Sequence, residues 1–440
     1  MNNFIIGNAV VVTVNKNMEI ISNGAVAVSG NIIKDIGTTV NIKKKYPSYK
    51  FIDTKNSLVM PGLINTHTHL PMSMVRGLAE DIELQEWLLK TYEFKMKFLP
   101  ADAIHTGVKL SLMELIKNGT TTICDMSFHQ HIISEIVKSF GIRAVLCDTM
   151  MAKYYKREIF NDIEKFLNTD YKTDLIIKGL ALHAPYTCDI EQFEWLKKML
   201  VKYPGLLYSI HLCETKNETF LVKKKLGETP VNLLRKRGLL TDNLLAVHCV
   251  WLTDKEIELF KKFNVKVSYN PESNMKLGSG TAPIVKMLKK NIIVGIGTDG
   301  AASNNDLDLF SEIDSGAKLQ KAGNINPTSP TATDMVRMAT INGAKCLGIE
   351  KITGSLEPGK KADIIILELQ QIRLKPVYDI NSQIVFSVNG RDVTDVIING
   401  KFIVRNRKFT ICDEKIFLDY VNNLNKKINQ KIKYLTKSNK

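Results

Sequence analysis

The sequence predicts an α/β fold: a (β/α)8 TIM barrel with a small β-sandwich domain formed from both chain termini. Two features of the 440-residue chain lead to this prediction. Apolar strand-like runs alternate with helix-like segments through the middle of the chain, and strand-rich segments flank that middle on both sides. Repeated alternation of strand and helix is typical of a parallel sheet that closes into a barrel.

The two flanks share a pattern of short β-branched runs separated by turn residues. The strand candidates in these flanks are 4–6, 10–14, 24–28, 32–33, 362–367 and 395–401. Because both ends of the chain carry the same pattern, we expect residues 1–58 and 351–410 to form one composite β-domain. The barrel would then occupy residues 59–350.

The middle of the chain supplies eight strand candidates, as a barrel requires. They are 58–64, 121–124, 142–147, 175–183, 206–211, 244–248, 265–269 and 292–299. Segments with helical periodicity lie between them, for example 103–118, which Gly119 ends as a C-terminal glycine should. Residues 411–440 repeat apolar residues at three- to four-residue spacing between lysines. We expect a C-terminal helix that packs on the β-domain rather than on a membrane surface.

The composition of the chain argues against nucleic-acid and membrane partners. The net charge is +15, but most of the basic residues are lysines scattered along the chain, whereas nucleic-acid readers rely on arginine. No run approaches the ~20 apolar residues that span a bilayer, and the N-terminus lacks a signal-peptide pattern. The seven cysteines form no C-x-x-C pair. We expect a cytoplasmic protein with a small-molecule substrate, no nucleic-acid or membrane partner, and a homo-oligomeric state as the default.

Histidines gather at the predicted strand ends. His67 and His69 follow the first strand at i, i+2 spacing, which points both imidazoles to one side. Alone, such a pair is as readily two solvated turn residues as half of a metal site. The residues at later strand ends are His183, His211, His248 and Asp299. Since barrel enzymes carry their chemistry at the C-terminal ends of the strands, we expect these side chains to share one site.

The remaining histidines fall elsewhere. His129 and His131 are expected in a loop after the second strand, and His105 on a surface helix.

Several longer motifs contain these residues. They are Pro61–His69, His211–Thr215, His248–Val250, Tyr269–Gly278, Gly297–Asn305 and Gly354–Asp363. In these motifs the chain resembles the amidohydrolase superfamily, and within it the deaminases of 5'-methylthioadenosine and S-adenosylhomocysteine. The resemblance covers nearly the whole chain except the last 30 or so residues. It implies hydrolytic release of ammonia from an adenosine-type nucleoside.

The resemblance also implies a metal site. His67, His69 and His211 would bind one divalent ion per chain through nitrogen, and Asp299 through oxygen. Zinc suits this donor set, with iron or manganese as alternatives. Binuclear relatives carry a carboxylated lysine at the end of the fourth strand, where this chain has His183. Lys178 lies inside that strand and is expected at the surface.

The resemblance assigns further roles by position. Glu214 would protonate the ring nitrogen beside the amine-bearing carbon. His248 would orient the attacking water, and Asp299 would accept its proton. His183, together with Glu214, would contact the substrate.

Two positions depart from the family pattern. The family carries a glutamate that holds the ribose hydroxyls where this chain has Met96, and an arginine that meets the far substituent where it has Asp148. Glu93, one helical turn before Met96, could replace the glutamate if that segment is helical. An aminohydrolase of another ring, such as guanine, a pterin or a triazine, is therefore an alternative, and a non-catalytic binding protein is a remote one.

Overall fold

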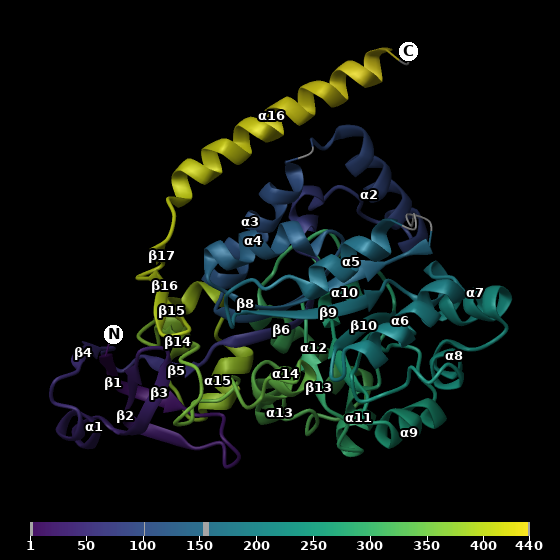
Figure 1. The fold of residues 1–440 in the computed structure, drawn as a ribbon. Coiled ribbons are helices and arrows are strands. Elements are labelled where there is room, and N and C mark those ends of the chain that lie inside the picture. Colours follow the sequence, from purple (N-terminus) through teal and green to yellow (C-terminus); the bar gives the residue numbers. More distant parts are fainter. Residues whose placement is uncertain (1–2, 101, 153–157, 439–440) are drawn as a thin grey trace.

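The computed structural model describes residues 3–100, 102–152 and 158–438, and it contains two β-systems (Figure 1). The first is a closed barrel of eight parallel strands, in the order β10-β11-β12-β13-β6-β7-β8-β9. Its strands are β6 (Leu63–Thr68), β7 (Thr120–Ser127), β8 (Arg143–Met150), β9 (Ile176–Leu182), β10 (Leu207–Leu212), β11 (Leu244–His248), β12 (Lys266–Tyr269) and β13 (Val294–Ile296). The predicted barrel, accompanied by a separate sheet from both termini, is confirmed.

The second β-system is a nine-stranded mixed sheet. Its strands are β1 (Asn3–Val12), β2 (Ile20–Ser29), β3 (Ile32–Thr38), β4 (Lys50–Asp53), β5 (Leu58–Pro61), β14 (Ile364–Leu367), β15 (Val393–Ile398), β16 (Lys401–Arg405) and β17 (Lys408–Phe409). Strand β5 joins the two ends of the chain, because it pairs parallel with β1 and antiparallel with β14. The hydrophobic side chains of this sheet form their own core cluster, which includes Ile6, Val59 and Ile364.

The prediction of one strand over 58–64 is wrong, because the chain breaks at Gly62 into β5 and β6. The two strands belong to different sheets, so the backbone must turn between them. A Cβ atom at Gly62 would lie only 2.1 Å from the side chain of Thr121, so a glycine is required at this close approach. The first barrel strand therefore starts later than expected and runs up to the histidine pair.

Helices cover the barrel, and shorter ones flank the terminal sheet. They are α1 (Thr39–Lys45), η1 (Leu70–Val75), α2 (Leu84–Phe98), α3 (Ala103–Lys117), α4 (Gln130–Phe140), α5 (Glu158–Asn168), η3 (Pro185–Thr187), α6 (Ile190–Lys202), α7 (Lys216–Leu226), α8 (Pro230–Lys236), α9 (Asp254–Lys262), α10 (Pro271–Lys276), α11 (Ile284–Lys289), α12 (Leu309–Gly323), α13 (Ala332–Met338), α14 (Ile341–Cys346), η4 (Ile372–Leu374), α15 (Ile380–Phe386), η5 (Gly390–Asp392) and α16 (Glu414–Ser438). His131 lies within α4 and His129 caps it, so the expected loop is a helix N-terminus. His105 is exposed on α3, as predicted.

A buried ion pair connects the barrel to the terminal sheet. Nε of Arg143, on β8, lies 2.9 Å from Oδ2 of Asp363, and neither side chain has any exposed area. Oδ1 of Asp363 also accepts the backbone N–H of Asn399 at 2.7 Å. Because loss of either partner would leave an unpaired buried charge, this contact fixes how the two β-systems meet.

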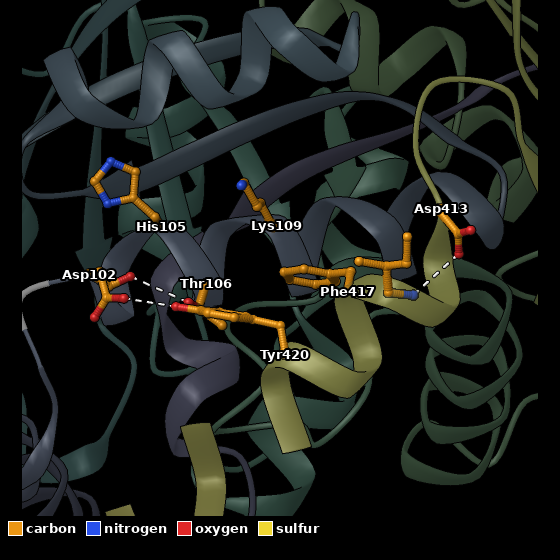
Figure 2. Close-up of a pocket in the computed structure, with 8 residues that line it drawn as sticks. Asp102, His105, Thr106, Lys109, Asp413, Phe417 and Tyr420 are labelled. Carbon is orange, nitrogen blue, oxygen red and sulfur yellow. Dashed lines mark hydrogen bonds between the residues drawn. The ribbon is translucent and has the colours of Figure 1, made fainter. Parts of the chain in front are cut away.

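The C-terminal helix α16 lies outside the barrel, past α2 and α3 (Figure 1). Its expected packing on the β-domain is wrong. Tyr420 donates a hydrogen bond to Asp102 before α3 at 2.8 Å, and Glu414 pairs with Lys117 of α3 at 2.7 Å. A groove of about 440 Å³ remains between α16 and α3, lined on the α16 side by Phe417 and Tyr420 (Figure 2). Further along α16, Leu424 and Ile428 lie with Phe98 and Pro100 in a second groove at the end of α2.

Within the residues that the structure describes, no helix is long and apolar enough to cross a membrane.

Candidate metal centre

Four side chains from three separate strand ends converge at the C-terminal mouth of the barrel. Donor atoms of His67, His69, His211 and Asp299 all lie within 4.8 Å of one another. Nε2 of His67 is 3.2 Å from Nε2 of His211, and Oδ1 of Asp299 is 3.3 Å from Nε2 of both His67 and His69. Strands β6, β10 and β13 come together here because the barrel closes between β13 and β6.

The donor atoms have the protonation states that a cation needs. Burial lowers the pKa of His67 to about 4 and the pKa of His211 well below its ordinary value. Burial raises the pKa of Asp299, but its hydrogen bond to His67 and the nearby imidazoles outweigh this and hold that pKa well below the usual range. Three imidazoles and one carboxylate suit a divalent transition metal such as zinc. The Nε2 atoms of His67 and His211 face each other at 3.2 Å, which is an arrangement suited to an ion held by both.

Outer contacts hold these ligands in place. Nδ1 of His69 lies at hydrogen-bond distance from the backbone carbonyl of Met126, which leaves Nε2 for the cluster. Oδ2 of Asp299 accepts hydrogen bonds from Ser273 at 2.6 Å and from Ser303 at 2.8 Å. The two serines were not singled out in the sequence, although both lie inside the motifs quoted above. They turn Oδ1 of Asp299 towards the histidines.

The backbone at the strand ends adopts the left-handed conformation at several non-glycine residues. The φ angles are +54° at Cys213, +70° at His248, +53° at Cys249 and +60° at Asp299. Such a conformation costs on the order of 1–3 kcal/mol per residue and is found where a site demands it. At these turns the chain leaves the strand direction, which aims Glu214, His248 and Asp299 at one point.

Glu214 lies beside the cluster without joining it. It is 7% exposed, and its Oε1 is 3.9 Å from Nε2 of His248. Burial raises the pKa of Glu214 above the ordinary carboxyl value. A carboxyl group in this setting keeps its proton at higher pH than usual, as a proton donor requires.

Glu218 positions Glu214. Its two carboxylate oxygens accept the backbone N–H groups of Cys213 at 2.9 Å and of Glu214 at 2.8 Å. Its side chain is buried, at 1% exposure. Sequence reasoning missed this residue, because a glutamate in the first turn of a helix is ordinary.

His248 is held by α10, the helix that follows β12. Its Nδ1 is 2.9 Å from Oδ1 of Asn274, a hydrogen-bond acceptor. Nδ1 therefore carries the proton, and Nε2 faces Glu214 with a free lone pair. An imidazole in this tautomer can accept a hydrogen bond from a water molecule in the site.

His183 borders the cluster on another side. Its ring centroid is 4.9 Å from that of His211, and burial lowers its pKa to about 3. Nδ1 of His183 lies 3.1 Å from the hydroxyl of Thr187. Lys178, in the same strand, points outwards and donates to the backbone carbonyl of Leu167 at 2.7 Å. The end of this strand therefore presents His183, and not Lys178, to the ligand His211.

The structure locates Met96 and Asp148, which depart from the family pattern, and Glu93, the suggested replacement for the missing glutamate. Met96 lies in α2, and the structure does not describe its side chain. Glu93 is 63% exposed and pairs with Lys97 at 3.7 Å, so the hypothesis that it replaces the ribose-binding glutamate is wrong. Asp148 is buried in β8, and burial raises its pKa to about 7, while the backbone N–H groups of Gln130 and His129 lower it. Its carboxyl group therefore lies at the N-terminus of α4.

Comparisons with known proteins agree with this geometry. A sequence model of the amidohydrolase family matches residues 58–403. The chain is 40% identical to a 5-methylthioadenosine/S-adenosylhomocysteine deaminase of Thermodesulfovibrio yellowstonii, over 94% of this chain and 96% of that one. It is also 40% identical to a 5'-deoxyadenosine deaminase of Methanosarcina acetivorans, again over 94% and 96%.

Solved structures show the same architecture. An adenosine deaminase from Xanthomonas campestris with bound zinc superposes with a TM-score of 0.93 at 30% identity, over 97% of this chain and 99% of that one. A triazine hydrolase variant superposes with a TM-score of 0.87 at 22% identity, over 97% and 100%, which shows likeness of fold alone.

Proposed function

The chain belongs to the amidohydrolase family, and on that premise we propose that it is a metal-dependent hydrolytic deaminase of adenosine-type nucleosides. The reaction consumes water and releases ammonia, which turns the adenine ring into the hypoxanthine ring of the inosine analogue. The substrates named for the relatives are 5'-methylthioadenosine, S-adenosylhomocysteine and 5'-deoxyadenosine. The observation that carries the proposal is the convergence of three histidines and Asp299 beside the buried carboxyl group of Glu214.

The metal would be held by His67, His69, His211 and Asp299, with one ion per chain and zinc as its identity. When bound, the ion supplies Lewis acidity, which lowers the pKa of a water molecule towards ~7. His183, rather than a lysine, follows β9 beside the cluster, and Lys178 of that strand donates to Leu167 instead, which supports a single ion. Zinc in the Xanthomonas structure supports the choice of metal.

The chain's own residues would move the protons. Glu214, whose pKa is raised by burial, donates its proton to the ring nitrogen beside the amine-bearing carbon. His248 accepts a hydrogen bond from the attacking water at Nε2 and orients it. Asp299 accepts the proton of that water and passes it to the departing amine. His183 and Glu214 border the space where the ring lies, which supports their roles as substrate contacts.

A panel assay tests this function. Purified zinc-loaded protein is offered the three nucleosides above together with guanine, a pterin and a triazine, and ammonia release is measured. We expect release from at least one adenosine derivative and about one metal ion per chain by elemental analysis. Ammonia from another ring alone, or from no compound, would contradict the proposal, and two ions per chain would contradict the single site. A cytoplasmic location and a homo-oligomeric state stay predictions.

A further inference from the structure

Helix α2 lies across the C-terminal mouth of the barrel. Trp87 of α2 shares an apolar cluster with Val75, which follows β6, and with Ala302, which follows β13. Gln85 of α2 forms a side-chain hydrogen bond with Tyr186, which follows β9. All three neighbours come directly after barrel strands, so α2 covers the end of the barrel where the metal centre lies.

The two faces of α2 differ in charge pairing. Ion pairs from Glu86 to Lys90 and from Glu93 to Lys97 lie on the outer face, and each of these side chains is more than half exposed. The inner face carries Trp87, Thr91 and Lys95 at four-residue spacing, so the three side chains lie in one row. Trp87 is 7% exposed and Thr91 is 2% exposed, which shows that this row faces the protein. Lys95 continues the row towards the end of the helix.

The ammonium group of Lys95 contacts Met72, a residue that lies near the ligand His69. Its Nζ is 3.3 Å from the sulfur of Met72. Met72 itself borders the ligands, because a Cβ atom placed on Gly300 would be 3.2 Å from Cβ of both Met72 and His69. The charge of Lys95 is also one of the causes, after burial, that lower the pKa of His183. Lys95 thus contacts Met72 and acts electrostatically on His183, which borders the ligand His211.

Lys95 has no acidic partner in the described part of the chain. Its one recorded polar contact is the thioether of Met72, a weak acceptor. By contrast, Lys90 and Lys97 on the outer face of the same helix each have a glutamate. Burial lowers the pKa of Lys95, which reflects the cost of keeping its charge away from water. An anionic group of a ligand would offset that cost.

We propose that Lys95 binds an oxyanion on the substituent of the substrate, and so selects adenosine derivatives that carry an oxyanion (the anionic substrates) over those that carry none (the neutral substrates). S-adenosylhomocysteine belongs to the first group through its carboxylate, although its ammonium group makes the whole molecule a zwitterion. The oxyanion is a carboxylate, as S-adenosylhomocysteine carries, or a phosphate. A charge-assisted hydrogen bond between an ammonium group and such an oxyanion is about twice as strong as a neutral one. The proposal rests on the proposed function and assigns α2, rather than the strand ends, the choice among adenosine derivatives.

The test compares one neutral and two anionic substrates. Catalytic efficiency, kcat/KM, is measured for 5'-methylthioadenosine, S-adenosylhomocysteine and adenosine 5'-monophosphate with the wild type, Lys95→Met and Lys95→Arg. Lys97→Met, on the outer face of the same helix, is the matched control. We expect Lys95→Met to lower kcat/KM about tenfold or more for at least one anionic substrate, through KM, and to leave the neutral one within about threefold. Lys95→Arg keeps the charge and should retain the preference, and Lys97→Met should behave as the wild type.

The two anionic substrates distinguish the sources of the oxyanion. A loss confined to S-adenosylhomocysteine indicates a carboxylate, and a loss confined to adenosine 5'-monophosphate indicates a phosphate. An equal loss for all three substrates, or no loss for any, would overturn the role of Lys95. Unchanged metal content and thermal unfolding would show that Lys95→Met is folded.

A binding measurement separates this inference from the proposed function. The affinities of the same three compounds are measured by calorimetry for Glu214→Gln and for Glu214→Gln/Lys95→Met. If the wild type releases no ammonia from any adenosine derivative, the proposed function fails, yet the binding data still decide the role of Lys95. Weaker binding of an anionic compound in the double variant alone supports it, and equal affinities in both variants overturn it.

Discussion

The mouth of the barrel has two parts that are built differently. The strand ends form its floor, and helix α2 covers it. On the floor, His67, His211 and Asp299 are buried, and their donor atoms lie close together. The pairing of the barrel strands leaves these side chains little freedom. The cover is a single helix that rests on the mouth through an apolar underside around Trp87. The metal ligands on the floor keep the family pattern, whereas the two departures are Met96 on the cover and Asp148 on β8.

Removal of the proton donor on the floor should have the largest effect. Glu214→Gln keeps the shape of the side chain but cannot deliver a proton, so we expect kcat to fall by ~10²–10⁴-fold. The bound metal should stay, because Glu214 is not among the four ligands. Kinetics and elemental analysis on the same preparation check both points. Glu93→Gln, on the exposed face of the cover, is the control and should leave the rate unchanged; a wild-type rate in Glu214→Gln would remove this residue from the mechanism.

Removal of Glu218, which positions Glu214, should have a smaller effect on the rate. Glu218→Ala leaves the backbone N–H groups of Cys213 and Glu214 without their acceptor, so Glu214 should lose its fixed position. Misplacement of a catalytic group by about 1 Å can cost up to ~10²-fold, and we expect a fall in kcat within that range with little change in KM. Glu218→Gln keeps one acceptor oxygen and should restore part of the rate. A change in KM alone would indicate that Glu218 acts on substrate binding, and Glu258→Ala on the exposed face of α9 serves as control.

Asp148 of β8 tests whether the charge reversal at this position affects stability rather than substrate choice. Burial raises its pKa to about 7, whereas the unfolded chain has the ordinary value of 3.8, so folding takes up a proton between these limits. Its contribution to the free energy of unfolding is therefore present at acidic pH and is lost as the pH rises through about 7. We expect Asp148→Asn to weaken that pH dependence, measured by thermal unfolding from pH 5 to pH 8, and to leave substrate preference unchanged. An altered ratio of kcat/KM between neutral and anionic substrates would assign Asp148 to the substrate space.

The smallest effect is expected from changes in α16, which packs against the end of α2. Leu424 and Ile428 of α16 are buried and lie with Phe98 and Pro100 in one groove at the end of α2. Leu424→Ala/Ile428→Ala should loosen that end, and amide hydrogen exchange in residues 84–98 should become faster. We expect KM to rise about two- to fivefold with kcat and metal content unchanged. Ile416→Ala, at an exposed position of the same helix, is the control, and unchanged exchange in α2 would show that α16 does not hold the cover.

The comparison also shows where sequence reasoning succeeded. His211 and Asp299 could be placed in one site because the C-terminal ends of parallel strands must meet at the same end of a barrel. The same reasoning could not find Glu218, whose role depends on two backbone N–H groups of a left-handed turn. It also treated 58–64 as one strand, because the close approach of Thr121 to Gly62 is a contact between distant segments.

Sequence by itself determined the barrel, the terminal sheet and the grouping of the strand-end histidines with Asp299, since strand periodicity and chain order dictate which ends lie together. The family resemblance then selected the four metal ligands among them. Tertiary structure alone decided which side of α2 faces the metal centre. Glu93 and Lys95 are two positions apart and so point in nearly opposite directions on a helix that turns about 100° per residue. Packing of Trp87 on the barrel mouth turns Lys95 inwards and leaves Glu93 in solvent. A helix fixes the angles between its own side chains, but only the surface it rests on fixes where they point.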